Sequence, residues 1–146
     1  MGSSSSDSIS VASNLITFSW EGFGLGSSNL SYKNESSADK YDMTASFYDL
    51  SYTFGEDLSY GFALGLLGNG TGKITSPSGN YETSEASGSY YSATLGSEFA
   101  GFEGLIGYQT INLKYKGFKS NADGSTLNTN ASISGGLLLF GLGVHF

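Results

Sequence analysis

Four carboxylates fall on one side of the sequence pattern with almost no base beside them. In runs that alternate between apolar and small polar residues, Glu21, Asp49, Glu98 and Glu103 all lie on the polar side. Buried carboxylates need water, a cation, protonation or a counter-charge, for which Lys114 is a candidate. Two interpretations stay open: an interior that prefers cations, or acids that are solvated where the strands end.

No group of residues in the sequence predicts catalysis. His145 is the only histidine and cysteine is absent, so neither a histidine relay nor a thiolate metal site can be built. Ser37 and Lys40 have the spacing of a serine acyl-enzyme motif, but they lie in a polar turn without the companion motifs. The glycines that begin at Gly22 lack the spacing of a dinucleotide loop. We therefore expect no enzyme, no metal and no cofactor.

The composition predicts an all-β chain. Aromatic residues make up 14% and charged residues only 13%, with 22 glycines and 1 proline. The formal net charge of −7, with no arginine and no cluster of lysines, argues against a nucleic-acid partner. No apolar run approaches the ~20 residues of a membrane-spanning helix. Any contact with a bilayer must therefore be made by strands.

Alternation with a period of two predicts six strands. Their ranges are 14–31, 41–54, 58–75, 81–99, 102–117 and 129–146. The first is the least regular, because residues 21–28 could be a glycine-rich strand or a turn. A turn there gives seven strands and places the two termini on opposite sides. We expect an even number, six or eight.

Short and long connections alternate along the chain. Gly55-Glu56-Asp57 and residues 98–104 make short turns, whereas residues 32–42, 68–89 and 114–132 are long and polar. Only about ten residues of each strand are rich in rings, which matches the ~9–11 that cross a membrane at a tilt. The polar parts are expected to project beyond it.

The chain ends on a strand with one apolar face. Leu138, Phe140, Leu142, Val144 and Phe146 alternate with smaller residues up to the last position. The ending resembles the C-terminal assembly signal of bacterial outer-membrane β-barrels, carried here by Gly141, Val144 and Phe146. Length and pattern are similar to the small members of that family, the outer-membrane protein X, A and W groups. The resemblance implies a transmembrane antiparallel up-and-down β-barrel, for which the family suggests eight strands.

Residues 1–8 are expected to be a leader or flexible tail, and residues 9–146 a single β-barrel domain. The resemblance implies a bacterial outer-membrane protein with polar extracellular hairpins and a structural or surface-interaction role. A narrow pore or transporter for small molecules and a soluble lipocalin-like ligand-binding barrel are the alternatives. Expected partners are outer-membrane lipid, lipopolysaccharide and, during biogenesis, the barrel assembly machinery; an oligomer remains open.

Overall fold

A computed structural model describes residues 8–36 and 38–144, and within these ranges the chain is all-β without a helix. Seven strands are long: β1 (Ser8–Trp20), β2 (Phe23–Glu35), β3 (Lys40–Phe54), β4 (Leu58–Ser76), β6 (Glu85–Phe99), β7 (Phe102–Lys116) and β10 (Ala131–Val144). Three are short: β5 (Gly79–Thr83), β8 (Phe118–Ser120) and β9 (Thr126–Leu127). No helix in the described ranges is long and apolar enough to cross a membrane.

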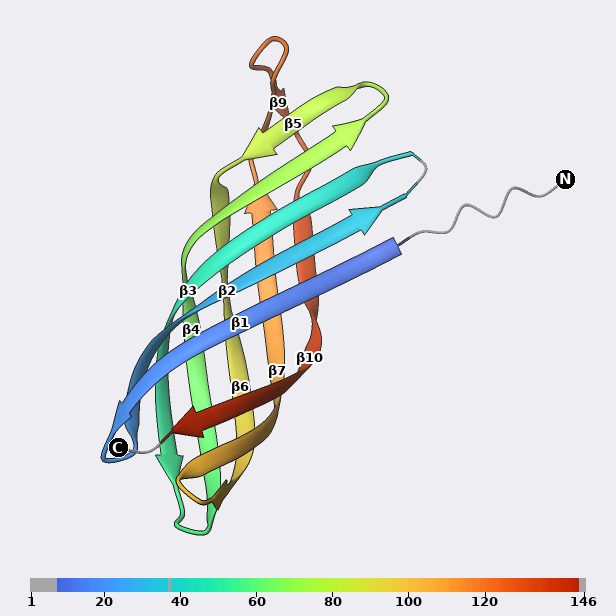
Figure 1. Cartoon of the computed structure of the whole chain (residues 1–146). Coiled ribbons are helices and arrows are strands. Elements are labelled where there is room, and N and C mark those ends of the chain that lie inside the picture. The colour runs from blue at the N-terminus through green and yellow to red at the C-terminus, as the bar shows by residue number, and fades with distance from the viewer. Residues whose placement is uncertain (1–7, 37, 145–146) are drawn as a thin grey trace, which may run out of the picture.

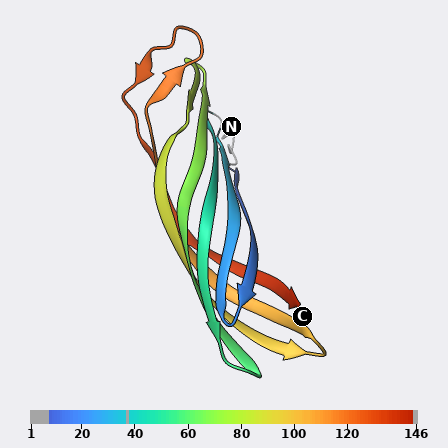
Figure 2. The same cartoon turned by 90° about the vertical axis from the view of Figure 1, so that its left-hand side faces the viewer.

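The long strands form one antiparallel up-and-down sheet, as the alternation predicts. Each pairs with the next along the chain, in the order β1-β2-β3-β4-β6-β7-β10 (Figure 1). The short strands continue the sheet at one end of the molecule, where β5 pairs with the last residues of β4, β8 with β5, and β9 with β8 (Figure 2). The sheet curls but is not closed, because among the described residues β1 pairs only with β2 and β10 only with β7.

The expected strand number is wrong at the N-terminal end. The predicted first strand, residues 14–31, is two strands joined by the two-residue turn Glu21-Gly22, whose φ angles are 48° and 87°. The β6–β7 turn, Ala100-Gly101, has φ angles of 54° and 82°. Positive φ at both central residues is what a type I′ hairpin turn requires, and it matches the twist of the strands. The long strands therefore number seven, and the two described ends lie at opposite ends of the sheet.

The other predicted elements need smaller changes. The ranges 41–54, 58–75 and 102–117 correspond closely to β3, β4 and β7. The range 81–99 is divided between β5 and β6, and β10 accounts for the described part of 129–146. The turn at residues 55–57 is confirmed. We call the part of the sheet near residues 21–22, 55–57 and 100–101 the short-turn half, and the remainder the hairpin half.

The polarity of the two faces is exchanged between these halves. On β3, the inward residues Met43 and Phe47 are buried in the hairpin half, and Asp49 continues the same face into the short-turn half. The outward face changes the other way, from exposed Thr44 to exposed Leu50. The hairpin half is thus apolar inside and polar outside, and the short-turn half is the reverse.

A β-bulge in β4 lies at the boundary between the two halves. It sets which side chains of β4 face inward in the hairpin half. Ser46 pairs with Asn69 and Phe47 pairs with Leu67, so Gly68 is the extra residue. After the bulge, Lys73 faces outward and is exposed, whereas Ile74 faces inward and is buried. Without the extra residue, every later side chain of β4 would be moved to the opposite face.

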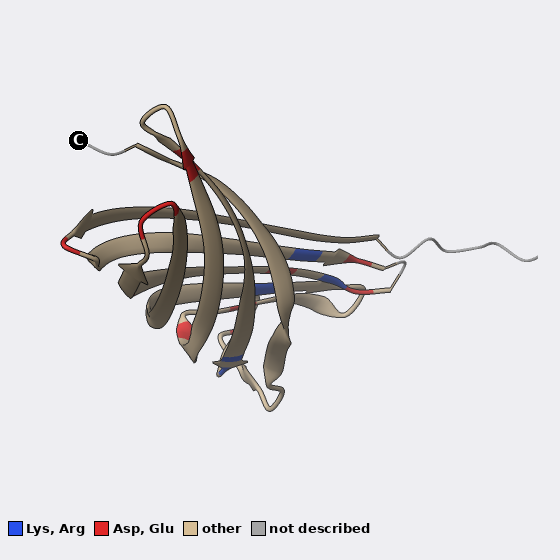
Figure 3. Ribbon diagram, turned by 90° about the horizontal axis from the view of Figure 1, so that it is seen from below, with Lys and Arg blue, Asp and Glu red and all other residues tan. Residues whose placement is uncertain are grey.

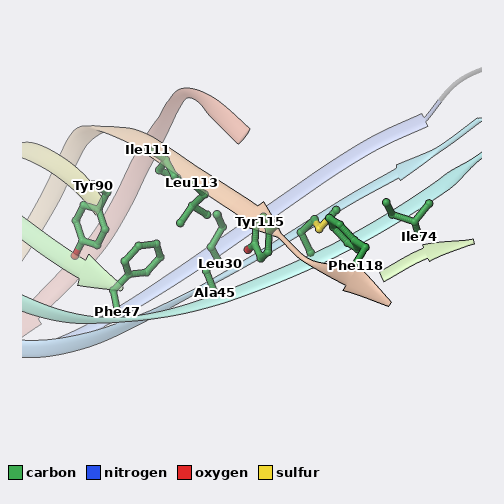
Figure 4. Close-up of a cluster of buried hydrophobic side chains, with 10 residues drawn as sticks. Leu30, Ala45, Phe47, Ile74, Tyr90, Ile111, Leu113, Tyr115 and Phe118 are labelled. Atoms are coloured by element: carbon green, nitrogen blue, oxygen red, sulfur yellow. The ribbon is translucent and has the colours of Figure 1, made fainter. Parts of the chain in front are cut away.

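The interior of the hairpin half is a packed apolar core (Figure 4). The rings of Phe47 and Tyr90 meet edge to face, with centroids 5.2 Å apart and planes at 80°. Tyr115 reaches across from β7 and donates a hydrogen bond from its hydroxyl to the backbone carbonyl of Thr44 on β3, at 2.8 Å. The buried members are Leu30, Met43, Ala45, Phe47, Ile74, Tyr90, Ile111, Leu113, Tyr115 and Phe118.

Replacing Gly65 by alanine should destabilise this packing. A Cβ atom on Gly65 would lie 2.0 Å from Cε1 of the fully buried Tyr90 ring, so the ring must move against Phe47. We expect Gly65→Ala to cost about 1–3 kcal/mol in the free energy of unfolding, the usual range for overpacking. Urea unfolding of the protein refolded in detergent micelles measures this cost. The control is Gly135→Ala, where a Cβ meets nothing within 4 Å; equal losses in both variants would contradict the proposed clash.

Candidate functional site

An apolar belt surrounds the outside of the short-turn half. Every long strand contributes large exposed side chains to it, and several are almost fully accessible, such as Phe18 at 81% and Leu142 at 84%. Water-soluble monomers rarely expose apolar patches of such continuity. The belt consists of Ile16, Phe18, Trp20, Phe23, Leu25, Tyr48, Leu50, Tyr52, Phe54, Leu58, Tyr60, Phe62, Leu66, Tyr91, Leu95, Phe99, Phe102, Ile106, Tyr108, Leu138, Phe140, Leu142 and Val144.

Aromatic rings mark both margins of the belt. Tyr48, Tyr91 and Tyr108 stand where the outer face becomes polar toward the hairpin half. At the opposite margin the rings touch one another, with centroids 4.8 Å apart for Phe23–Tyr52, 6.2 Å for Tyr52–Phe54 and 5.5 Å for Phe54–Tyr60. Aliphatic residues lie between the two aromatic margins. This order is the one found where a protein surface passes through the two interfaces of a bilayer.

The interior of the short-turn half holds two buried carboxylates. Asp49 is 4% exposed, and its Oδ1 accepts a hydrogen bond from Ser28 Oγ at 3.1 Å. The Tyr90 hydroxyl faces the same carboxylate. Glu103 is 8% exposed and accepts a hydrogen bond from Ser59 at its Oε1. Each of these two acids is therefore supported by a serine hydroxyl from another strand.

The other two acids expected in the lumen lie elsewhere. Glu21 belongs to the β1–β2 turn and is exposed, so it does not line the interior. Glu98 is next to the last residue of β6 and is also exposed, which agrees with the alternative of solvated acids at the strand ends. Lys114 is exposed on the outer face of the hairpin half. It therefore cannot serve as the counter-charge for the interior carboxylates.

Charge is distributed unevenly between the two halves, because lysines lie only in the hairpin half whereas acids occur in both (Figure 3). The short-turn half carries Glu21, Asp49, Glu56, Asp57, Glu98 and Glu103 but no lysine. All six lysines of the chain lie in the hairpin half, at positions 33, 40, 73, 114, 116 and 119. Two pairs are in ionic contact: Lys33 Nζ with Asp42 at 3.9 Å, and Lys73 Nζ with Glu82 at 3.5 Å. These exposed pairs contribute little stability.

The interior is closed where the two halves meet. Phe47 and Tyr90 come together from β3 and β6, and the buried side chains of Leu113, Tyr115 and Phe118 fill the space beyond them. The polar interior of the short-turn half thus ends against an apolar plug, which we define as Phe47, Tyr90, Leu113, Tyr115 and Phe118. A hollow of about 600 Å³ lies among β3, β4, β5 and β8, where Asp42, Lys73, Glu82 and Lys119 contribute to its lining.

The described residues offer no cluster that could hold a metal ion. Between residues 8 and 144, apart from residue 37, no three histidine, cysteine or carboxylate side chains gather into a metal-binding cluster. Of the proposed assembly signal, Gly141 and Val144 lie on β10, with Val144 outward and 54% exposed. Ser37, His145 and Phe146 lie outside the described residues.

Residue types alone did not single out the partners of the acids. Ser28 and Ser59 are ordinary serines in alternating strands, and only the register places them beside Asp49 and Glu103. Tyr90 shares a face with the interior residue Ser92, so its inward direction was available from the alternation. The alternation does not predict which residue of a distant strand the Tyr90 side chain contacts.

Comparison with protein-family models, with curated proteins and with solved structures finds no match for the chain. The similarity to small outer-membrane barrels therefore stays a prediction from the sequence pattern. What the chain does has to be inferred from the belt, the buried acids and the plug.

Proposed function

We propose that the chain is a small barrel protein of the bacterial outer membrane, without catalytic activity, whose role is structural or in surface interaction. The short-turn half spans the bilayer, and the hairpin half stands in solution outside the cell. The observation that carries this proposal is the exchange of polarity between the halves. A belt of exposed aromatic and aliphatic residues over a small polar interior suits a lipid environment, and the reverse arrangement suits water.

The plug favours this role over a pore or transporter. A conducting barrel needs a continuous polar path, but the interior carboxylates are separated from the hairpin end by Phe47, Tyr90 and the core beyond them.

The same core argues against the lipocalin-like alternative. The hairpin half does have an apolar inside and a polar outside, yet ten buried apolar side chains fill its centre. It holds side chains where a ligand-binding barrel would hold a ligand.

The single tryptophan provides a test of the membrane location. Trp20 lies in the belt and is 80% exposed. We expect lipids with brominated acyl chains to quench its fluorescence after reconstitution, and aqueous iodide to have little effect. We also expect the protein to need detergent for solubility and to give a heat-modifiable band on gels.

A matched control moves the fluorophore to the hairpin half. In a Trp20→Phe/Asn112→Trp variant, the new side chain replaces an exposed outward residue of β7 above the belt. It should be quenched by iodide and spared by brominated lipid. A monodisperse monomer at high concentration without detergent, or the same quenching at both positions, would refute the proposed bilayer crossing.

The plug predicts that the protein does not conduct ions. We expect no steady current steps from the wild-type protein in planar bilayers, and no change with Asp49→Asn, because the blocked interior offers ions no path past Phe47 and Tyr90. Protease protection of the same protein in vesicles verifies that it has inserted. Steady cation-selective channels that Asp49→Asn weakens would instead support the pore.

The C-terminal residue should act in assembly. Phe146 completes the sequence pattern of the assembly signal, so deleting it or introducing Phe146→Asp should lower the amount of folded protein in the outer membrane. The neighbouring His145→Gln change, which keeps the pattern, serves as the control. Surface levels can be measured by labelling whole cells. Normal levels of both Phe146 variants would remove the support that the motif gives to the outer-membrane location.

A further inference from the structure

The curled sheet presents two long edges without a pairing partner. β1 is paired along one side only, through thirteen residue pairs with β2, and β10 along one side only, through fourteen pairs with β7. Within residues 8–36 and 38–144, their backbone groups on the other side have no ladder partner. Unpaired backbone groups are costly in hydrocarbon, where water cannot replace a missing strand.

The two edge strands are also the only long strands without a charged residue. β1 reads SISVASNLITFSW and β10 reads ASISGGLLLFGLGV, whereas each of the five long strands between them contains a lysine or a carboxylate. Permanent edges in proteins are usually protected by lysine, by proline or by inward charges. The absence of charge in β1 and β10 is therefore typical of interior strands, which are paired on both sides.

The directions of the edges determine what can join them. Six antiparallel pairings separate β1 from β10, so both run from the hairpin half toward the short-turn half. Direct contact of the two edges would be parallel. A second copy in the same bilayer would also meet β10 with a parallel β1, a step that rests on the proposed function. One strand running the opposite way would pair antiparallel with both edges and complete an eight-stranded wall, the smallest number common among such barrels.

Inward side chains of β1 meet the opposite wall at one point and stay uncovered elsewhere. Ser13 Oγ on β1 donates a hydrogen bond to Gln109 Oε1 on β7 at 3.4 Å, so side chains from β1 already reach the wall beyond β10. At the same time, inward apolar residues of β1 stay uncovered, with Ile9 64% and Val11 39% exposed. A single strand added beside β1 would cover these residues.

We propose that β1 and β10 together accept one extended segment of a partner polypeptide as an eighth strand. The segment runs from the short-turn half to the hairpin half and spans about the thirteen residues of β1. Its outward residues are apolar in the short-turn half, and its inward residues are apolar in the hairpin half, where they cover Ile9 and Val11. It contains no proline, since each backbone N–H is needed in a ladder.

A synthetic peptide with the sequence of residues 23–35 is a suitable probe. In the protein this sequence runs in the required direction, pairs with β1 over its whole length and carries the required change of polarity. We expect the labelled peptide to bind the refolded protein in micelles and in vesicles at one peptide per chain. A peptide of the same composition in scrambled order should bind more weakly, on the order of tenfold or more, because lost alternation places side chains on the wrong face. A peptide with Leu30→Pro should also lose affinity.

Cysteine crosslinking locates the bound peptide, because the chain has no cysteine of its own. A peptide with cysteine in place of Ser31, which pairs with Ala12 in the β1–β2 register, should crosslink to Ala12→Cys on β1 and to Ser134→Cys on β10, in separate variants. Absence of saturable binding would overturn the proposal. So would intramolecular disulfides between Ala12→Cys and cysteines placed along β10, which would show direct closure, or disulfides between two copies. Lipid quenching of Trp20 does not depend on the peptide, so failure of strand addition is distinguishable from failure of the membrane location.

Discussion

The contact between the rings of Phe47 and Tyr90 is the point on which both halves of the structure depend. It closes the apolar core on one side, and on the other side Tyr90 faces Asp49, the first carboxylate of the polar interior. Gly65 leaves the space into which the Tyr90 ring fits, and the bulge at Gly68 keeps β4 in phase on both sides of the contact. This layer of side chains thus separates two regions of opposite interior polarity. Because the strands run through this layer without interruption, neither region can be rearranged independently.

The buried acids show how serine hydroxyls support a polar interior. All lysines lie in the hairpin half, so Asp49 and Glu103 are supported by the hydroxyls of Ser28 and Ser59. A hydroxyl donor is a small group, and it fits among the glycines of these strands where a lysine side chain would not. The cost is sensitivity to register, since moving a strand by one residue would place each serine on the outer face. The two-residue turns beside these strands restrict such a slip.

Much of the fold could be predicted from the sequence because a period of two is a strong signal when one face is rich in rings. The alternation located β3, β4 and β7 almost to the residue, and it showed the all-β antiparallel fold. A turn within residues 21–28 was one of two alternatives and was set aside in favour of an even strand number, although Trp20-Glu21-Gly22-Phe23 repeats the pattern of Phe99-Ala100-Gly101-Phe102. The glycines after residue 22 made the turn hard to predict, because a glycine-rich sequence is compatible with both a strand and a loop.

The core of the hairpin half was harder to foresee. Its buried residues, such as Leu30, Leu113 and Phe118, stand singly among serines, lysines and asparagines in stretches that read as polar connections. Single apolar residues at alternate positions are too sparse to predict burial from one strand alone. They form a core only because the strand register places residues of several strands side by side. The acid sites have the same limitation. The alternation indicated that Asp49 and Glu103 face inward, but it could not separate them from Glu21 and Glu98, whose exposure depends on where each strand ends.

The exchange of polarity also means that the two halves derive their stability from different sources. In the hairpin half, burial of the ten core side chains stabilises the fold wherever the outer face meets water. In the short-turn half, the interior is mainly glycine, serine and threonine, so little apolar area is buried there by folding alone. The free energy for that half must come from the belt, and the belt contributes only if something apolar surrounds it. The core can therefore hold the strands in register before the belt is covered, and the environment of the belt decides whether the short-turn half is stable.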